Sequence, residues 1–332
     1  MKPDRRGIIC AGNWIVDLVH DIEHWPDESN LARIGDQTRG IGGGAANVIR
    51  GLARLQTGLP LWPMGAIGDD EPGAFILEGC RRLGLPTDKL SIKPGVPTAH
   101  THVMSVAGRS RTFFYQGGAN DALAASDFPQ GTFAQTPARV FYLGYLSLLG
   151  ELDLIEPDGI SGAARVLQRA QQAGLTTCVD LVSVLHPEFH KIVESAAPFI
   201  DYLVLNEIEA ARATETEVES QSLIETKKLF QMASSLTKLG VTKAVVVHCV
   251  ERAVWHGTDG TKLSVEIAAL PPEEIGSNLG AGDAFCAGLI FALHENWSPE
   301  RALDLAVATA RASLRGYTAT EAIPPLAQLE LT

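Results

Sequence analysis

The second half of the chain alternates short apolar runs with longer amphipathic segments, and this alternation limits the folds that the chain can adopt. Apolar runs of strand length lie at residues 140–146, 175–180, 202–205 and 244–250. Segments with helical periodicity lie between them, at residues 160–174, 187–197 and 223–239. Strands that are joined through helices run parallel, and helices then cover both faces of their sheet. The pattern predicts an α/β fold with a central, mostly parallel sheet.

The first half of the chain contains two further buried strands and a separate group of β segments. Apolar runs at residues 7–12 and 61–67 predict the buried strands. Residues 26–41 are polar and have no helical period, which indicates a hairpin or a flap. Two β-rich runs, 98–106 and 111–116, predict a second hairpin whose turn is at residues 107–110.

The stretch Ser277-Asn278-Leu279-Gly280-Ala281-Gly282-Asp283 carries a chemical signal. Its glycines allow a tight loop that leads into an apolar helix. The first amides of a helix have no internal partner, and the helix dipole favours an anion beside them. A carboxylate in an anion site repels phosphate, so Asp283 is better explained as a general base beside amides that hold a phosphoryl group. The alternative is a packed helix with a capping aspartate.

A second glycine run, Gly42-Gly43-Gly44, precedes another predicted helix. The missing side chains let a ligand lie against the backbone, and the amide of Asn47 can both donate to and accept from a polyol. The run lacks the G-K-[ST] of a Walker loop and the G-x-G-x-x-G of a dinucleotide site. Asp17 follows the first predicted strand, where a carboxylate can bind substrate hydroxyls; an exposed turn aspartate is the alternative.

The segment Asn206-Glu207-Ile208-Glu209 follows the strand at 202–205 directly. An asparagine with a glutamate three residues later fits a capping box, which is a purely structural interpretation. The functional interpretation places Asn206 and Glu209 beside phosphates, with Glu209 holding water around Mg²⁺. Magnesium keeps several waters and takes few protein ligands, so one carboxylate is enough for this role.

Composition excludes several classes of partner. The 332 residues carry a formal net charge of -12, and no cluster of lysine and arginine resembles a nucleic-acid footprint. No apolar run approaches the roughly 20 residues of a membrane span, and the N-terminus does not resemble a signal peptide. The five cysteines are scattered without metal-ligand spacing, which predicts reduced core residues in a cytoplasmic protein.

Three motifs together resemble the PfkB (ribokinase-like) family of carbohydrate and nucleoside kinases. They are Gly42-Gly43-Gly44-Ala45-Ala46-Asn47, Asn206-Glu207-Ile208-Glu209-Ala210 and Gly280-Ala281-Gly282-Asp283-Ala284-Phe285. The resemblance covers nearly the whole chain and implies one domain with a three-layer α/β/α fold. It also implies a small β-sheet lid from about residues 14–40 and 98–117, which in this family often mediates dimerisation.

The resemblance also implies a role for each candidate residue. Asp283 is expected to be the general base, and the amides of Gly280, Ala281 and Gly282 the anion hole. The residues expected to bind the hydroxyls of a sugar are Asp17, Gly43, Gly44, Asn47 and, from the lid, Arg111. ATP is expected near Asn206, Glu209, Asn278 and His248, with Glu209 holding Mg²⁺ through water. Closure of the lid would exclude water from the reaction.

Three departures from the family pattern bear on these expectations. Ser277 stands where the family usually has an aspartate that helps to hold a monovalent cation, which puts that cation in doubt here. Val250 and Ala253 stand where the nucleotide loop usually has glycines, so their side chains could crowd a triphosphate or change the nucleotide preference. The strand that ends in Asp180 usually continues as D-x-N-x-R, so an expected polar contact is missing.

Two alternative functions stay open. The acceptor would be a nucleoside if Trp14, Phe113 and Tyr115 formed a clamp for a base. A non-catalytic ligand-binding relative is supported only by the altered nucleotide loop. An oxidoreductase that uses a dinucleotide is disfavoured, because no strand–G-x-G-x-x-G–helix unit occurs. We interpret His100 and His102 as structural residues of the lid.

Overall fold

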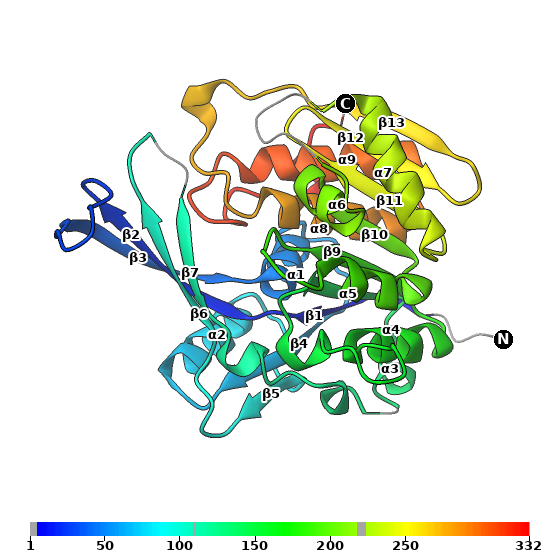
Figure 1. The fold of residues 1–332 in the computed structure, drawn as a ribbon, viewed down its shortest axis with the longest axis horizontal. Helices are drawn as coiled ribbons and strands as arrows, with labels where there is room; N and C mark the ends of the chain where they lie inside the picture. Colours follow the sequence, from blue (N-terminus) through cyan, green and yellow to red (C-terminus); the bar gives the residue numbers. More distant parts are fainter. Residues whose placement is uncertain (1–4, 109–110, 130, 218–223, 332) are drawn as a thin grey trace.

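The computed structural model describes residues 5–108, 111–129, 131–217 and 224–331 of the chain. Within these residues, nine strands form a main sheet in the order β13-β12-β11-β10-β9-β8-β1-β4-β5. Four further strands form a small sheet in the order β3-β2-β6-β7, which projects from one side of the main body (Figure 1).

The main sheet is parallel from β5 to β11, and β12 and β13 extend it as an antiparallel hairpin at one edge. Its strands are β1 (Ile8–Gly12), β4 (Leu61–Gly68), β5 (Leu90–Lys93), β8 (Val140–Leu146), β9 (Thr176–Leu181), β10 (Tyr202–Asn206), β11 (Ala244–His248), β12 (Arg252–Gly257) and β13 (Lys262–Glu266). The parallel strands predicted from the alternation are confirmed. The short strand β5 is not among the predicted strands, because four residues are too few for a clear alternation of apolar and polar side chains.

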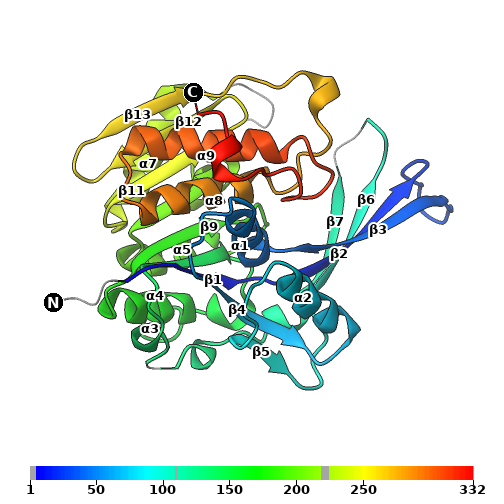
Figure 2. The ribbon, with the colours of Figure 1, turned by 180° about the vertical axis from the view of Figure 1, so that it is seen from behind.

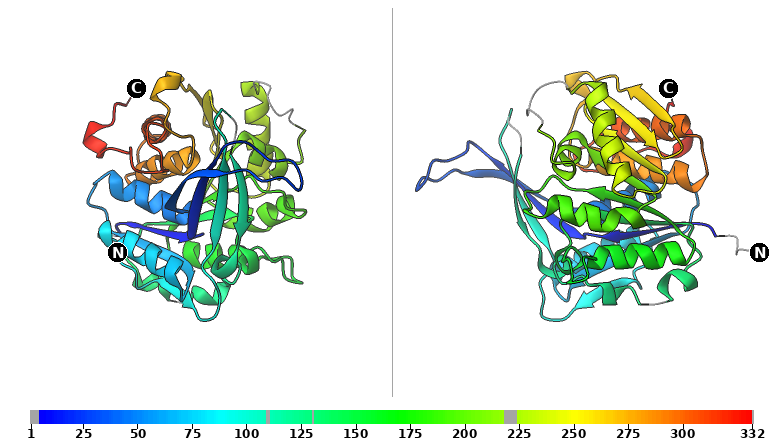
Figure 3. Two further views of the ribbon diagram at one scale, coloured as in Figure 1. Left: turned by 90° about the vertical axis from the view of Figure 1, so that its left-hand side faces the viewer. Right: turned by 45° about the vertical axis from the view of Figure 1, so that its right-hand side comes forward.

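Two helical layers cover the main sheet, and each layer encloses its own hydrophobic core. Figure 2 shows one layer, formed by α1 (Gly44–Arg54), α2 (Glu71–Arg82), α8 (Ala281–His294) and α9 (Pro299–Ser313). The other layer contains α3 (Thr132–Gln135), α4 (Gly162–Gln172), α5 (Phe189–Ala196), α6 (Glu207–Ala213) and α7 (Thr226–Lys238). The sheet lies between the two layers (Figure 3), which confirms the predicted three-layer α/β/α fold.

The helix that begins at the G-A-G-D motif is hydrophobic on all sides because it is buried between the sheet and α9. Gly288 of α8 lets the two helices approach closely, since a Cβ there would lie 2.6 Å from Thr309 Oγ1. The helices in the described ranges do not combine the length and the hydrophobicity needed to cross a bilayer.

The small sheet contains β2 (Ile15–Ile22), β3 (Ile34–Gly42), β6 (His100–Ser105) and β7 (Thr112–Gln116). The runs predicted as a hairpin pair antiparallel as β6 and β7, but residues 109–110 of the predicted turn lie outside the described residues. The polar segment at residues 26–41 contributes β3, which pairs with β2. The sequence predicts Asp17 just past the end of the first strand, with an exposed turn as the alternative; Asp17 lies within β2, between Gly40 and Thr101 of the neighbouring strands.

The chain passes from the main sheet to the small sheet at Trp14, and Asn120 holds this crossing in place. The buried Asn120 side chain accepts a hydrogen bond from the Trp14 N–H at 3.1 Å. Its Nδ2 donates to the Trp14 carbonyl and to the Tyr115 hydroxyl, both at 3.2 Å. Asn120 therefore satisfies both backbone groups of Trp14 at the junction of the two sheets.

Replacing Asn120 by alanine is expected to destabilise the protein by about 2–4 kcal/mol, because two buried backbone groups of Trp14 lose their partner. Denaturant unfolding of Asn120→Ala measures this change. Asn30→Ala is the matched control, because Asn30 is exposed and its side chain forms no hydrogen bond within the described residues. Equal stability of the two variants would contradict the assignment.

Candidate active site

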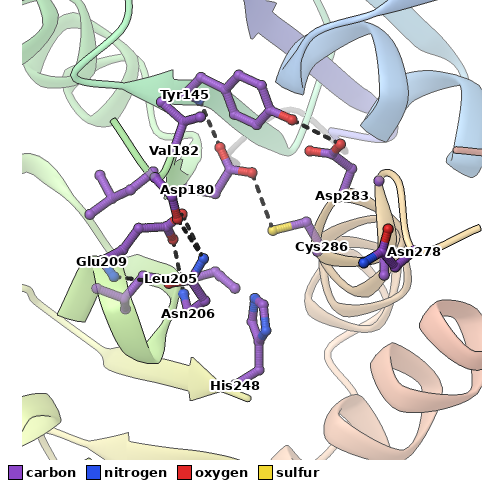
Figure 4. Close-up of a pocket in the computed structure, with 16 residues that line it drawn as sticks. Tyr145, Asp180, Val182, Leu205, Asn206, Glu209, His248, Asn278, Asp283 and Cys286 are labelled. Carbon is purple, nitrogen blue, oxygen red and sulfur yellow. Dashed lines mark hydrogen bonds between the residues drawn. The ribbon is translucent and has the colours of Figure 1, made fainter. Parts of the chain in front are cut away.

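A cavity of ≈ 240 Å³ lies at the carboxyl ends of the parallel strands, beside the N-terminus of α8 (Figure 4). Ligands of open α/β sheets bind at this edge. The cavity is lined by residues from β8, β9, β10, β11, α6 and α8 and from the segments that follow β9 and precede α8: Tyr145, Asp180, Leu181, Val182, Ser183, Val204, Leu205, Asn206, Glu209, His248, Asn278, Gly280, Ala281, Gly282, Asp283 and Cys286. This lining contains three carboxyl groups and no lysine or arginine among the described residues.

The N-terminus of α8 presents free amides to the cavity. Gly280 precedes the helix with φ 72°, and a Cβ there would lie 2.3 Å from Ala319 Cβ, so the turn requires glycine. The Ala281 amide reaches the Asn278 carbonyl only at 3.5 Å. The Gly282 and Asp283 amides have no acceptor among the described residues. They are therefore available to an anion in the cavity.

Asp283 lies on the first turn of α8, and the residue is 4% exposed. Its Oδ2 accepts hydrogen bonds from Asn47 Nδ2 at 2.8 Å and from the Tyr145 hydroxyl at 3.0 Å. Burial raises the pKa of Asp283 to about 7, although the bonds from Asn47 and Tyr145 act in the opposite direction. The carboxyl group therefore changes its protonation near neutral pH, as a general base requires.

Asn47 joins the glycine run to this carboxyl group. It lies on the first turn of α1, and its Oδ1 is buried without a hydrogen-bond partner among the described residues. An unpaired buried oxygen is costly unless a ligand donates to it. Gly43 adopts φ 94° against the carbonyl of Asn13, and Gly44 lies against the ring of Tyr145, so neither position has room for a side chain.

Asp17 approaches the same region from the small sheet. Its carboxyl group lies against Gly42, where a Cβ would be 2.0 Å from Asp17 Oδ2. Burial raises the pKa of Asp17 to about 6, against the hydrogen bond from Thr101 and the charges of Arg50 and Arg111. The charge of Asp17 in turn helps to raise the pKa of Asp283, so the two carboxyl groups are electrostatically linked.

Arg111 connects the small sheet to the loop that leads into α8. Its Nη1 donates to Ser277 Oγ at 3.0 Å, and the same oxygen accepts the Leu279 amide at 3.0 Å. Ser277 is buried, and the loop continues directly into the cavity-lining residues. A residue of the small sheet thus contacts the main body close to the free amides of α8.

Asn206 and Glu209 form the capping box that the sequence indicates, and both also line the cavity. Asn206 Oδ1 accepts the amides of Ile208 and Glu209, while Glu209 Oε2 accepts the Asn206 amide, each at 2.9 Å. Glu209 Oε1 accepts Asn206 Nδ2 at 2.8 Å and Ser183 Oγ at 2.9 Å. Ser183, in the stretch after Asp180, therefore bonds to both residues of the capping box.

His248 ends β11 and lies beside Phe285, with ring centroids 4.8 Å apart. Burial lowers the pKa of His248 to about 4, so the imidazole is neutral at physiological pH. Val250 is 83% exposed and Ala253 is buried in β12. Neither residue lines the cavity, so the side chains that replace the family's glycines do not narrow it.

The pfkB family carbohydrate kinase model matches residues 5–325 of the chain. This protein belongs to the PfkB family. The predicted family is confirmed, and with it an enzyme of the carbohydrate kinase class. The remaining functional assignments depend on the geometry of the site.

Individual PfkB-family relatives resemble the chain along most of its length. A 5-dehydro-2-deoxygluconokinase of Geobacillus thermodenitrificans is 22% identical over 330 residues, which cover 97% of this chain and 91% of the relative. A ribokinase of Arabidopsis thaliana is 26% identical over 322 residues, covering 96% and 78%. The structure of Arabidopsis thaliana ribokinase complexed with ribose and ATP matches with a TM-score of 0.78 at 24% identity, covering 97% of each chain.

The cavity of this PfkB-family protein also contains residues that the motifs do not reveal. Tyr145 donates to Asp283, and Asp180 accepts the Tyr145 amide at 2.8 Å. Tyr145 lies in the apolar run of β8, where an aromatic residue is expected to pack in the core. The sequence indicates Asp180 only as the carboxylate near the end of β9.

Removing the guanidinium of Arg111 is expected to loosen the loop before α8, because Ser277 loses its link to the small sheet. Hydrogen exchange of the Leu279 amide in Arg111→Ala should become about tenfold faster, the effect of losing one charge-assisted hydrogen bond. Arg33→Ala is the control, since Arg33 is an exposed arginine near the small sheet. Unchanged exchange at Leu279 would show that the contact does not order the loop.

Proposed function

We propose that the protein is an ATP-dependent kinase that transfers the γ-phosphoryl group of ATP to a hydroxyl group of a sugar or sugar derivative. One observation carries this proposal: a buried carboxyl group with a pKa near 7 lies on the same helical turn as unpaired backbone amides. A base for an alcohol and donors for a phosphoryl group are the two functions that this reaction needs. Membership of the PfkB family supports the same reaction.

In this mechanism Asp283 is the general base. It accepts the proton of the acceptor hydroxyl as the oxygen attacks phosphorus. The amides of Gly280, Ala281 and Gly282 act as the anion hole for the transferring group. Within the described residues the Gly282 amide is unpaired, and the Ala281 amide is held only by a 3.5 Å contact with the Asn278 carbonyl. Because these donors are fixed by the helix, they need no reorganisation when charge develops.

The acceptor binds between the small sheet and α1. Asp17 accepts hydrogen bonds from its hydroxyl groups, and the unpaired Oδ1 of Asn47 accepts another. Gly43 and Gly44 leave room for the acceptor against the backbone, and Arg111 contributes from the small sheet. The small sheet acts as a lid over this region, and its closure excludes water that would otherwise compete as a nucleophile.

ATP binds along the cavity that Asn206, Glu209, Asn278 and His248 line. A lining with carboxyl groups and no cationic side chain suits a nucleotide that arrives with its own metal ion. Bound Mg²⁺ supplies positive charge to the phosphates. Within the described residues no group of three or more acidic, histidine or cysteine side chains could hold a metal, so Glu209 is proposed to bind Mg²⁺ through water.

A monovalent cation does not fit the loop before α8. Ser277 Oγ, which replaces the family's aspartate, already accepts the Arg111 guanidinium and the Leu279 amide. A second positive charge at this oxygen would be repelled by the guanidinium, with no carboxylate to compensate. We therefore assign no role to such a cation.

Exposed aromatic side chains in the outer part of the small sheet also support a homodimer. Trp25, Phe113 and Phe114 are about half exposed, and the rings of Trp25 and Phe114 stack at 6.2 Å. Exposed aromatic side chains of this kind favour a protein partner. We propose a second copy of the chain as that partner.

Asp283→Asn should lower turnover by about 10²- to 10⁴-fold, since the amide cannot accept the proton. A screen of sugars and nucleosides that reads ADP release identifies the acceptor and then compares this variant with the wild type. Asp88→Asn, at an exposed position, is the control. Full turnover in Asp283→Asn would refute the role of the base.

The same screen separates the alternatives. Release of ADP with nucleosides alone would identify a nucleoside kinase. No release with any acceptor, together with no calorimetric binding of ATP and Mg²⁺ at millimolar nucleotide, would indicate a non-catalytic relative.

The value of kcat/KM should rise with pH through about 7, because Asp283 must be ionised to accept a proton and burial has raised its pKa to this value. Below pH 6 most of the carboxyl groups are protonated and kcat/KM falls about tenfold for each pH unit. Measurement of kcat/KM from pH 5.5 to 9 tests this. A flat profile below pH 7 would contradict the assignment.

A further inference from the structure

Tyr145 lies between two buried carboxyl groups that belong to different elements (Figure 4). Its hydroxyl donates to Asp283 Oδ2 at 3.0 Å, and its backbone amide donates to Asp180 Oδ1 at 2.8 Å. Asp283 and Asp180 are both buried, with 4% and 6% of the residue exposed. One residue thus links the end of β9 to the first turn of α8.

The backbone at Tyr145 is unusual for an aromatic residue. β8 leaves its register with β9 between Leu143 and Leu146, and Tyr145 adopts φ 60° within this irregularity. Non-glycine residues in this region are strained and persist where the surroundings hold them. The Asp180 carboxyl group provides that hold through the Tyr145 amide. Irregularities of this kind redirect side chains, and they are frequent beside active sites.

The ring of Tyr145 is held by Gly44. A Cβ on Gly44 would lie 2.6 Å from Tyr145 Cδ1, so the ring occupies the space that any other residue would need. The third glycine of the run is therefore explained by Tyr145 as well as by a ligand. Strand β8, strand β9 and helix α1 together fix the position of one hydroxyl group.

The two oxygens of Asp283 have different surroundings. Asn47 and Tyr145 both donate to Oδ2, whereas Oδ1 receives no hydrogen bond from the described residues. Burial, followed by the charges of Asp283 and Asp180, raises the pKa of Tyr145 well above its ordinary value, so its hydroxyl keeps its proton and stays a donor. Two donors on one oxygen leave the other oxygen as the free acceptor.

We propose that Tyr145 is a positioning residue that saturates Oδ2 of Asp283 and so directs Oδ1 toward the acceptor hydroxyl. This proposal rests on the proposed function, in which Asp283 is the base. Tyr145 orients Asp283 and stabilises its ionised form, and Asp180 acts one step further away by fixing the Tyr145 backbone. The proton of the acceptor moves to Oδ1, and Tyr145 neither gains nor loses a proton.

The test compares Tyr145→Phe with Tyr202→Phe. Tyr202 is a partly buried tyrosine at the start of β10, and it has no contact with Asp283 or Asp180 among the described residues. In Tyr145→Phe, kcat should fall about 10- to 100-fold and KM should stay within about twofold. The acid limb of the kcat/KM profile should move up by about one pH unit, because the carboxylate loses a stabilising donor. Tyr202→Phe should keep the wild-type limb.

A second variant, Gly44→Ala, keeps the Tyr145 hydroxyl group but displaces the ring that carries it. It should shift the acid limb of the pH profile in the same direction. Thermal unfolding of each variant identifies any that do not fold. An unchanged acid limb in folded Tyr145→Phe would overturn the proposal, as would a rise in KM with kcat and the limb unchanged, since Tyr145 would then only bind substrate.

A titration without catalysis separates this proposal from the proposed function. Aspartate labelled with ¹³C at the carboxyl carbon gives an NMR signal for Asp283 that Asp283→Asn identifies by its absence. A raised pKa of that signal in Tyr145→Phe supports the positioning role even if no acceptor is found. A pKa equal to that of the wild type contradicts it, whatever the enzyme phosphorylates.

Discussion

Burial of the Asp283 carboxyl group at the start of α8 is the interaction around which the rest of the site is arranged. Burial raises the pKa of this group to about 7, and without donors the ionised form would be costly. Asn47 and Tyr145 provide those donors from α1 and β8. Ionisation of this one carboxyl group therefore depends on the relative positions of α1, β8 and α8.

The cavity contains two further buried acids, Asp180 and Glu209, whose ionised forms are also costly. Burial, followed by the charge of Asp283, raises the pKa of Asp180 well above its ordinary value, and burial raises that of Glu209 as well. Burial and the charge of Asp283 thus both disfavour the ionised form of Asp180. The neutral His248 adds no charge of its own. Neighbouring carboxyl groups whose pKa values differ can take different roles in one site.

Sequence reasoning predicted the parallel sheet, its helical layers and the segments that meet at its carboxyl edge. These succeed because strand and helix periods, glycine runs and helix caps are local signals. The contact between Asn47 and Asp283 links residues 236 positions apart in sequence, yet the two motifs that contain them could be paired through the family resemblance.

Tyr145 is a residue of the site that could not be predicted from the sequence. Its role depends on the irregular register of β8 and on a left-handed backbone, and neither leaves a signal in the run Phe141-Tyr142-Leu143-Gly144-Tyr145. Strand β2, which contains Asp17, is expected only through the family resemblance, because its alternation of apolar and polar residues is interrupted. The partner of Ser277 could not be foreseen, since Arg111 is 166 positions away.

The bond between Arg111 and Ser277 makes the two halves of the site thermodynamically dependent on each other. Arg111 belongs to the small sheet, and Ser277 belongs to the loop that presents the free amides of α8. A molecule that binds at the small sheet and favours this bonded arrangement strengthens, by a certain factor, the binding of a second molecule at the loop before α8. Reciprocity then requires that the second molecule strengthen binding of the first by the same factor, so this bond would make binding cooperative in addition to any direct contact between the two molecules.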